Sequence, residues 1–497
     1  MSSWAIAVLT VYFLVLSILA IFGIHRYIIL YIYLKNKNKI SKPLSEFKNL
    51  PRVTVQLPVY NEMYVVRRLI DSVCQLKYPK NLLEIQVLDD SADATQKIAQ
   101  ERVEFYKNKG IDIQYFHRED RTGFKAGALE EGLKYAKGEF IAIFDADFIP
   151  TPNFLFETIH YFTDPQIGMV QARWGHINRN YSLLTQVQSI LLDGHFVIEH
   201  TARDRTGKFF NFNGTAGIWR KKTIFSAGGW QHDTLTEDLD ISYRAQIKGW
   251  RFIYLPQIVV PAELPIEMNA FKCQQHRWAK GSIQTAKKLL GKIFKAKLAF
   301  PIKLEAFFHL CDNVAYLMMI PLSLAIFPTV ILRKNLGLYE MVIIDFPLIM
   351  LATGSVGAFY IYSQKEIYLD WPGRLKYLPF LMALGIGLAV NNAKAVLEAL
   401  LDKKSAFERT PKFGIQDSKK KWKMKKYSGK RTYLAYIELF LGIYFTVTVV
   451  ISIKEGIYLT LPFLLLFQIG YLYTSFFSFF QNKQIFNWAL RKAENKS

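Results

Sequence analysis

The chain has 497 residues, of which 51% are hydrophobic and 15% aromatic. These fractions are high for a soluble enzyme and ordinary for a membrane protein, and the length allows two or three structural units. The formal charge is +22, but no nucleic-acid-binding signature accompanies it, so we predict no nucleic-acid partner. A lipid bilayer and an anionic substrate explain the charge better. The three cysteines have no paired spacing, which argues against a disulfide framework or a zinc site and favours a reducing, cytosolic environment.

The amino-terminal segment is predicted to be a transmembrane anchor, residues 1–38. Residues 4–34 are mainly apolar, and Lys35, Lys37 and Lys39 follow them. By the positive-inside rule, these lysines place the carboxyl end of the span in the cytosol. The apolar run is too long for the core of a signal peptide and has no basic leader, so we expect the anchor to be retained.

Residues 39–265 change to a pattern that alternates strands and helices. The predicted strands are 52–57, 84–89, 111–116 and 140–144, and the predicted helices between them include 65–75 and 95–107. This alternation is typical of an α/β domain with a parallel, doubly wound sheet, here inserted between transmembrane helices. In such sheets, ligands bind at the carboxyl ends of the strands.

The rest of the chain is predicted to return to the membrane, with interfacial helices at 266–304 and a membrane region at 305–497. Candidate spans are 305–332, 341–363, 433–452 and 457–480, each near the length that a bilayer requires. Residues 403–431 carry a dozen lysines and arginines against two acids, so they should be cytosolic like the α/β domain. The crossings between the two are then even in number. We therefore predict an interfacial or re-entrant helix at 375–400 and five crossings in all; the alternative is a sixth span and an inverted tail.

The first two predicted strands end in polar residues that suit a nucleotide. Tyr60 and Glu62 follow the first strand, where a ring can stack on a base and a carboxylate can bind the ribose. Asp89 and Asp90 end the second strand, within reach of the nucleoside. Each pair has an ordinary alternative, a polar turn in the first case and a helix cap in the second.

Asp145 and Asp147 follow the strand at 140–144. Alternation along an extended chain places both carboxylates on the same side, which predicts a site for Mg²⁺ or Mn²⁺ on a diphosphate. Lys125, among small residues, could add a positive charge to the phosphates. The alternative is two solvated acids in a loop.

Asp238, in the string Thr236-Glu237-Asp238, is predicted to be a general base for an acceptor hydroxyl. Alone, Thr-x-Asp is also a common helix start. Upstream, Asn213, Gly214 and Thr215 lie in a turn against which a sugar could lie.

Gln274, Arg277 and Trp278 have helical spacing and should share one face of a helix. The indole can stack on a sugar ring, and the guanidinium can pair with a leaving diphosphate. The alternative is a tryptophan that anchors the chain at the membrane interface.

The order of these motifs resembles the processive family 2 glycosyltransferases, the cellulose synthase and hyaluronan synthase group. The strings VLDDS at 87–91, KAGAL at 125–129, IFDADF at 143–148, FNGTAG at 212–217 and QQHRW at 274–278 look most like the cellulose-synthase-like glucomannan and β-glucan synthases. The resemblance implies a GT-A-like, Rossmann-like domain. It also implies the following roles: nucleotide binding by Tyr60, Glu62, Asp90 and Lys125; metal binding by Asp145 and Asp147; catalysis by Asp238; and an acceptor site formed by Gln274, Arg277 and Trp278. From their positions in the motifs, we further expect Asp89 and Arg277 to contact the nucleotide sugar and Asn213, Gly214 and Thr215 to contact the acceptor.

A segment within 403–431 is similar to the family's Phe-x-Val-Thr-x-Lys gating loop. Phe407, Thr410 and Lys412 match its pattern, whereas Arg409 stands where valine is usual. This departure puts the fine contacts of the loop in doubt. No second-messenger sensor of the cellulose synthase kind is expected after the last span.

The motifs and the resemblance predict an inverting, processive β-glycosyltransferase with its catalytic domain on the cytosolic face of a bacterial inner membrane or of a Golgi or plasma membrane. It would polymerise a hexose from UDP-glucose or GDP-mannose into a β-glucan or β-mannan and translocate the nascent polysaccharide. One alternative is a non-processive membrane enzyme that glycosylates a lipid. A second is a transporter whose soluble domain only senses a nucleotide sugar.

Overall fold

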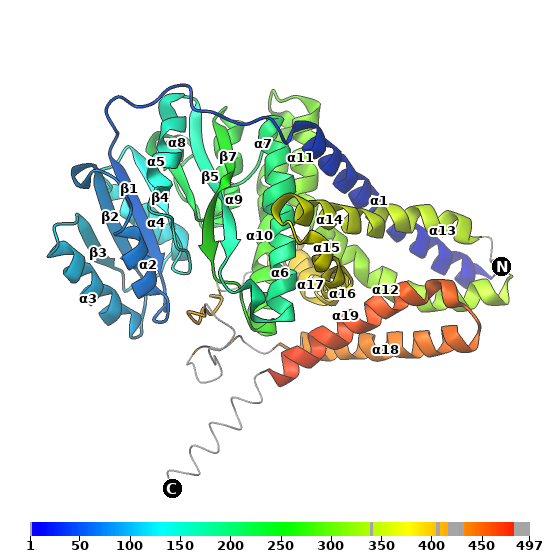
Figure 1. The fold of residues 1–497 in the computed structure, drawn as a ribbon. Helices are drawn as coiled ribbons and strands as arrows, with labels where there is room; N and C mark the ends of the chain where they lie inside the picture. Colours follow the sequence, from blue (N-terminus) through cyan, green and yellow to red (C-terminus); the bar gives the residue numbers. More distant parts are fainter. Residues whose placement is uncertain are drawn as a thin grey trace, which may run out of the picture.

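The computed structural model describes residues 2–337, 341–403, 408–415, 427, 429 and 432–481. A sheet domain lies at one end of the molecule, and long helices project from it (Figure 1). Helix α10, Met268–Lys295, stands between the two parts.

The sheet has seven strands in the order β3-β2-β1-β4-β6-β5-β7. The strands are β1 Val53–Val59, β2 Leu83–Asp89, β3 Ile113–His117, β4 Phe140–Ile143, β5 Ile167–His176, β6 Gly217–Arg220 and β7 Arg251–Ala262. The first four are parallel to one another, as predicted. β6, however, is antiparallel to both β4 and β5, so the prediction of a wholly parallel sheet is wrong.

The direction of β6 has a structural reason and a consequence for the site. After β5 the chain passes through four helical segments and returns through the turn at 212–216, entering the sheet between β4 and β5. In the antiparallel register, Gly217 at the start of β6 pairs with Ile143 at the end of β4. The glycine-containing turn therefore lies beside Asp145, which follows β4.

Helices cover both faces of the sheet. One apolar cluster joins β1 and β2 to α2 Val66–Val73, α3 Thr95–Lys107 and α5 Phe154–Ile159. The other joins the opposite face to α4 Phe124–Tyr135, α8 Lys221–Ser226 and α9 Glu237–Ile247. The apolar periodicity of the sequence thus produces a helix-sheet-helix sandwich with its loops at the carboxyl ends of the parallel strands.

Five helical segments in the described part of the chain are long and apolar enough to cross a membrane. They are α1 Ser3–Asn36, α12 Val314–Asn335, the segment Ile343–Ile367, α18 Leu434–Lys454 and the segment Tyr458–Phe480. The segment Ile343–Ile367 joins α13 Val342–Ile349, less its first residue, through a π-helical turn to α14 Ser355–Ile367, and Tyr458–Phe480 contains α19 Leu461–Phe480.

The predicted span at 305–332 begins too early. Residues Phe300–Cys311 form a separate helix, α11, and α12 starts only at Val314. Glu305 of α11 accepts a hydrogen bond from Arg203 at 3.0 Å. Glu305 also lies 3.1 Å from His25 Nε2 of α1, so this buried carboxylate connects α11 both to the sheet domain and to the first membrane helix.

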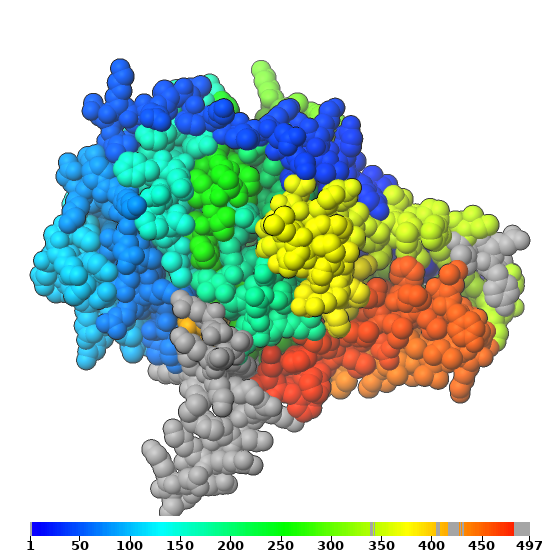
Figure 2. Space-filling view, in the orientation of Figure 1, coloured from blue at the N-terminus to red at the C-terminus, as the bar shows by residue number. Residues whose placement is uncertain are grey.

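The ambiguous segment 375–400 forms a bent pair, Trp371–Gly387 followed by Ala389–Leu400, with a 41° change of direction. The pair contains α15 Trp371–Arg374, α16 Leu378–Gly387 and α17 Ala389–Leu400. In Figures 1 and 2, the segment lies where the sheet domain meets the long helices. Counting it as one span would raise the crossings from five to six, so the interfacial position remains a prediction.

Candidate active site

One cavity opens at the carboxyl ends of β1 and β4, between the start of α9, the first half of α10 and the segment 408–412. It brings together nearly all the residues that the motifs identified. The predicted residues that line it are Tyr60, Glu62, Asp90, Lys125, Asp145, Asp147, Asn213, Gly214, Asp238, Gln274, Arg277, Trp278, Thr410 and Lys412.

Two predicted residues lie behind the cavity wall instead. The buried Asp89 carboxylate accepts hydrogen bonds from the Tyr115 hydroxyl at 2.7 Å and from the Ser91 backbone at 2.8 Å. The buried Thr215 hydroxyl accepts from the backbone N–H of Asp145 at 2.9 Å. Both contacts position neighbours of the site, and neither residue lines the cavity. Phe407, the first residue of the predicted gating loop, lies outside the described residues.

Three arginines contact predicted nucleotide-binding residues. Two of them, Arg118 and Arg121, belong to no motif that the sequence revealed. The guanidinium of Arg121 lies 3.2 Å from the centroid of the Tyr60 ring. Arg118 donates two hydrogen bonds to Asp90, at 2.8 and 2.6 Å. Charge-assisted pairs of this geometry fix the carboxylate and leave its outer edge toward the cavity.

The third arginine is Arg409, which stands where the gating-loop pattern of the family usually has valine. It forms a bidentate ion pair with Glu62, at 2.8 and 2.7 Å. Burial raises the pKa of Glu62 to about 7, and Arg409 opposes the rise. The substitution thus links the segment 408–412 directly to the predicted ribose side of the site.

Asp145 and Asp147 both face the cavity, and each carries a lysine partner. Lys125 Nζ lies 2.5 Å from Asp145 Oδ1, and Lys412 Nζ lies 2.7 Å from Asp147 Oδ2. Burial raises the pKa of Asp145 while Lys125 lowers it, with a net increase. Carboxylate pairs are ligands that suit Mg²⁺ or Mn²⁺. No group of three or more His, Cys, Asp or Glu side chains in the described residues could hold a metal, so an ion here would need oxygens from the bound diphosphate.

Asp238 lies in the first turn of α9, beside the turn that precedes β6. Burial and the negative charge of Glu237 raise its pKa to about 7, opposed by Lys125. A carboxylate with this pKa accepts a proton readily at neutral pH. Gly214 permits the close approach: it has φ +80°, and a Cβ there would lie 3.0 Å from Asp238 Oδ2 and 3.2 Å from Lys125 Nζ.

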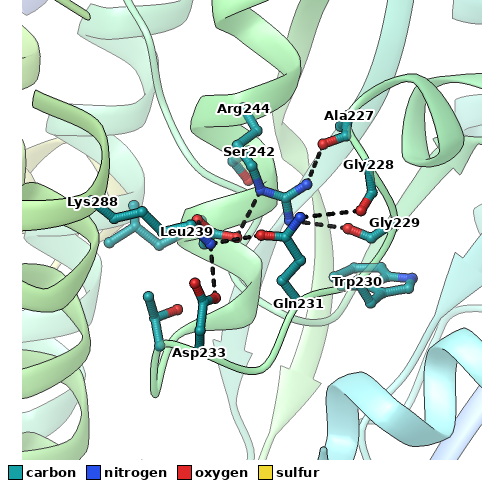
Figure 3. A network of polar contacts seen from close by, with 12 residues as sticks. Ala227, Gly228, Gly229, Trp230, Gln231, Asp233, Leu239, Ser242, Arg244 and Lys288 are labelled. Carbon is teal, nitrogen blue, oxygen red and sulfur yellow. Dashed lines mark hydrogen bonds and ion pairs between the residues drawn. The ribbon is translucent and has the colours of Figure 1, made fainter. Parts of the chain in front are cut away.

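A polar network fixes α9 against α10 (Figure 3). Arg244 donates to Asp240 at 2.8 Å and to the backbone carbonyl of Gly229 at 3.0 Å. From α10, Lys288 reaches Asp240 at 2.9 Å and Asp233 at 2.7 Å. The network therefore sets the position of the predicted base relative to the helix that carries the Gln-x-x-Arg-Trp motif.

That motif lies on α10 as predicted, with its three side chains on the cavity. Arg277 donates to the backbone carbonyl of Glu408 at 3.1 Å. Gly281, one turn after the tryptophan, lets α10 approach α9, since a Cβ there would lie 2.5 Å from Thr236. α10 and the start of α9 are thus in close packing contact beside the motif and the predicted base.

A second, polar cavity continues behind the first and shares Asn213, Asp238, Gln274 and Trp278 with it. Asn213 contacts two histidines here: its Oδ1 lies 2.6 Å from His200 Nε2, and its Nδ2 lies 3.0 Å from His195 Nε2. Both histidines come from the π-helical turn Gly194–His200. These histidines were not predicted, because the residues of a short π-helical turn follow no spacing that can be recognised in a sequence.

A third cavity lies among the membrane helices. It shares Arg26, Asp312 and Tyr316 with the second cavity and extends to Arg333 and Asp345. Its lining is mainly apolar, drawn from α1, α12, α16 and α19. The three cavities therefore follow one another from the sheet domain to the far ends of the membrane helices.

Comparison with known families agrees with this arrangement. The model described as Glycosyl transferase family 2 matches residues 54–225. The model described as Glycosyl transferase family group 2 matches residues 140–390, half of the chain. The chain is a family 2 glycosyltransferase.

The curated relatives of this family 2 glycosyltransferase include glucomannan 4-beta-mannosyltransferases of plants. It is 46% identical over 254 residues to Glucomannan 4-beta-mannosyltransferase 2 of Arabidopsis thaliana, which covers 50% of this chain and 48% of that protein. It is 39% identical over 323 residues to Glucomannan 4-beta-mannosyltransferase 1 of Cyamopsis tetragonoloba, covering 61% of each. The chain thus spans about half to three fifths of the length of these relatives.

Among solved structures, the mannosyltransferase PcManGT from Pyrobaculum calidifontis, determined in complex with GDP-Man and Mn²⁺, is similar in fold. The TM-score is 0.51 at 21% identity, over 78% of this chain and 100% of that chain. The likeness establishes a GT-A-like mixed α/β domain in the family 2 glycosyltransferase.

Proposed function

We propose that the chain is an inverting, processive β-mannosyltransferase that uses GDP-mannose and builds a β-mannan or glucomannan. The observation that carries the proposal is the single cavity in which Asp238, Asp145, Asp147 and Trp278 meet. GDP-mannose is favoured over UDP-glucose as the donor because the similar proteins are mannosyltransferases, one of them determined in complex with GDP-Man. The membrane helices place the reaction at a bilayer, with the sheet domain on the cytosolic side by the predicted topology.

The residues of the cavity support a single displacement. Asp238 takes the proton from an acceptor hydroxyl, and the hydroxyl oxygen bonds to the anomeric carbon of the donor sugar as the bond to the nucleoside diphosphate breaks. A single displacement with Asp238 as the base would invert the anomeric centre. A pKa near 7 lets Asp238 exist as a base before the step and hold the proton after it.

The diphosphate end of the cavity requires positive charge. Lys125, Lys412 and Arg277 line it, and Asp145 and Asp147 would hold Mg²⁺ or Mn²⁺. The ion would neutralise charge on the leaving diphosphate. Because Lys412 contacts Asp147, we infer that Lys412 exchanges this contact for the diphosphate when the donor binds, whereas Arg409 keeps its ion pair with Glu62.

The acceptor side favours a polymer. Trp278 can stack on the terminal sugar, and the second and third cavities continue away from it toward the far side of the membrane helices. We propose that the growing chain occupies these cavities in turn and is translocated through them. A lipid acceptor is the alternative, since the third cavity is mainly apolar.

The test is product analysis with purified protein in membranes. GDP-mannose and UDP-glucose are supplied separately and together, and the labelled product is sized and digested with linkage-specific mannanases and glucanases. Long, mannanase-sensitive chains at limiting enzyme are the expected result. Single-sugar lipid adducts would replace the proposal with the lipid glycosyltransferase, and incorporation from UDP-glucose alone would correct the donor.

A further inference from the structure

A polar cluster ends the third cavity at the side far from the sheet domain. Arg333 of α12 donates to Asp345 Oδ1 of α13 at 3.1 Å and also contacts the other carboxylate oxygen. Its guanidinium lies 5.1 Å from the ring centroid of Tyr12 in α1. The side chains of the pair are only 13% and 10% exposed. Three helices thus bring a buried cation, an anion and an aromatic ring to one end of an apolar cavity, and ionisable residues in such segments are rarely without a function.

Two polar atoms of this cluster have no hydrogen-bond partner among the described residues. They are Thr329 Oγ1 and Arg333 Nε, both buried. Thr329 is 2% exposed and lies one helical turn before Arg333, so both project from the same face of α12. Both residues also line the third cavity. A buried donor or acceptor without a partner lowers stability, so its retention on a cavity wall points to a ligand that supplies the partner.

A purely structural role does not account for these atoms. Another ion pair already links two helices at the same end of the molecule: Lys334, near the end of α12, pairs with Glu455, the residue after α18. That pair is exposed and does not line the cavity. It binds its helices together without a buried hydroxyl or an unpaired guanidinium nitrogen.

We propose that Thr329, Arg333, Asp345 and Tyr12 form a saccharide-binding site at the exit end of the third cavity. The ligand is a neutral β-linked hexose chain: its hydroxyls complete the hydrogen bonding of Thr329 and Arg333 and donate to the Asp345 carboxylate, while the flat face of a sugar ring packs on Tyr12. The site deepens the proposed function and rests on its translocation step. It would bind the leading sugars of the polymer as they leave the membrane.

The experiment uses inside-out membrane vesicles that contain the full chain, supplied with labelled GDP-mannose. The quantity measured is the fraction of polymer that resists external β-mannanase until detergent is added. Thr329→Val keeps the side-chain shape and loses the hydroxyl, and Arg333→Gln loses the charge. Lys334→Gln, beside them in sequence but off the cavity, is the matched control. We expect the protected fraction to fall by about threefold for Thr329→Val and by about tenfold for Arg333→Gln, as expected for lost neutral and charged hydrogen bonds, with the control unchanged.

The outcomes separate the site from the proposed function. If the unmutated chain makes polymer but protects none of it, translocation is wrong and the site falls with it. If the unmutated chain protects its polymer and Thr329→Val does so equally, the site alone is overturned. A charge-exchanged variant, Arg333→Asp with Asp345→Arg, controls for folding. A normal protein yield with a low protected fraction supports the site. Full recovery of the protected fraction would show that the ion pair only links the two helices, and would overturn the site.

Discussion

The sheet domain and the membrane helices place their polar residues in opposite ways. In the sheet domain, functional side chains come from short contiguous strings at strand ends, and a charged partner meets each carboxylate: Lys125 with Asp145 and Lys412 with Asp147. In the membrane half, isolated residues from distant helices face a mainly apolar cavity, as Arg333 and Asp345 do. The contrast teaches that the residues for transfer are encoded in local strings of sequence, whereas the proposed path of the product depends on the packing of distant helices.

The largest expected effect tests the local encoding. Chelation should reduce sugar incorporation to background, because the Asp145 and Asp147 carboxylates repel a diphosphate and can hold it only through a cation. The measurement is labelled-sugar incorporation in EDTA, followed by restoration with excess Mg²⁺ or Mn²⁺. Undiminished incorporation in chelator would show that Lys125 and Lys412 neutralise the diphosphate unaided.

Asp238→Asn should lower the transfer rate by roughly a hundred- to ten-thousand-fold, the usual contribution of a general base. The amide keeps the shape of the side chain but cannot accept the proton, so binding of the donor should persist. Single-turnover transfer and donor binding are measured on the same preparation, with Asp112→Asn, a partner of Arg52 and Lys137 just before β3, as the control. Near-normal turnover would move the base to Glu237, which also lines the cavity.

Gly281→Ala tests the junction between the two halves. Its Cβ would lie 2.5 Å from Thr236, so α10 would be pushed from α9 and the acceptor motif from the base. A misplacement of this kind should lower the transfer rate by about ten- to a hundredfold. Gly291→Ala is the matched control on the same helix, because a Cβ there meets nothing within 4 Å. That control should keep its rate and gain about 0.5–1 kcal/mol in stability, measured by thermal unfolding; equal rates for the two variants would refute the junction.

Much of the sheet domain could be predicted because its signals are local. The helix at 95–107 has the predicted bounds, and the first four strands appear close to their predicted positions. The motifs meet because parallel strands end at one edge of the sheet. β5, β6 and β7 were not predicted, and the direction of β6, Gly217–Arg220, depends on where the chain returns to the sheet rather than on its own pattern.

The rest of the site could not be predicted because its contacts join distant parts of the chain. Asp89 and Asp90 are neighbours in one string, yet only Asp90 lines the cavity, since successive side chains of a strand point to opposite faces. Arg409 was visible as a departure from a pattern, but its partner Glu62 lies 347 residues away. His195 and Arg333 belong to no motif at all, and only the packing of several helices gives them a cavity to face.

The pH dependence of transfer should follow Asp238, whose pKa is about 7 in the folded protein. The base works only when it is deprotonated, so the rate should be constant well above pH 7 and fall by about tenfold per unit well below it. The groups facing it include Glu237, which raises the pKa, and Lys125, which lowers it. Transfer rates at saturating donor between pH 5 and 9 provide the measurement, and the residual rate of Asp238→Asn should lack this titration. A flat profile in the unmutated enzyme would remove Asp238 from the proton transfer.

The smallest expected effect concerns Arg409, where the sequence departs from its family pattern. Arg409→Val restores the usual residue and leaves Glu62 without its bidentate partner. Burial already raises the pKa of Glu62 to about 7 and Arg409 opposes the rise, so in the variant the carboxyl should be largely protonated at neutral pH. A protonated Glu62 accepts fewer hydrogen bonds from the nucleotide sugar, so the KM for the nucleotide sugar should rise about threefold at pH 7 and recover at higher pH, in line with the loss of one neutral-strength hydrogen bond.

The KM is measured from pH 6 to 9 for Arg409→Val and for Glu62→Gln. The glutamine cannot titrate, so Glu62→Gln should show a raised but pH-independent KM. If Arg409→Val lowers the KM at every pH, then the ion pair competes with the donor for Glu62, and the segment 408–412 restrains the site instead of completing it.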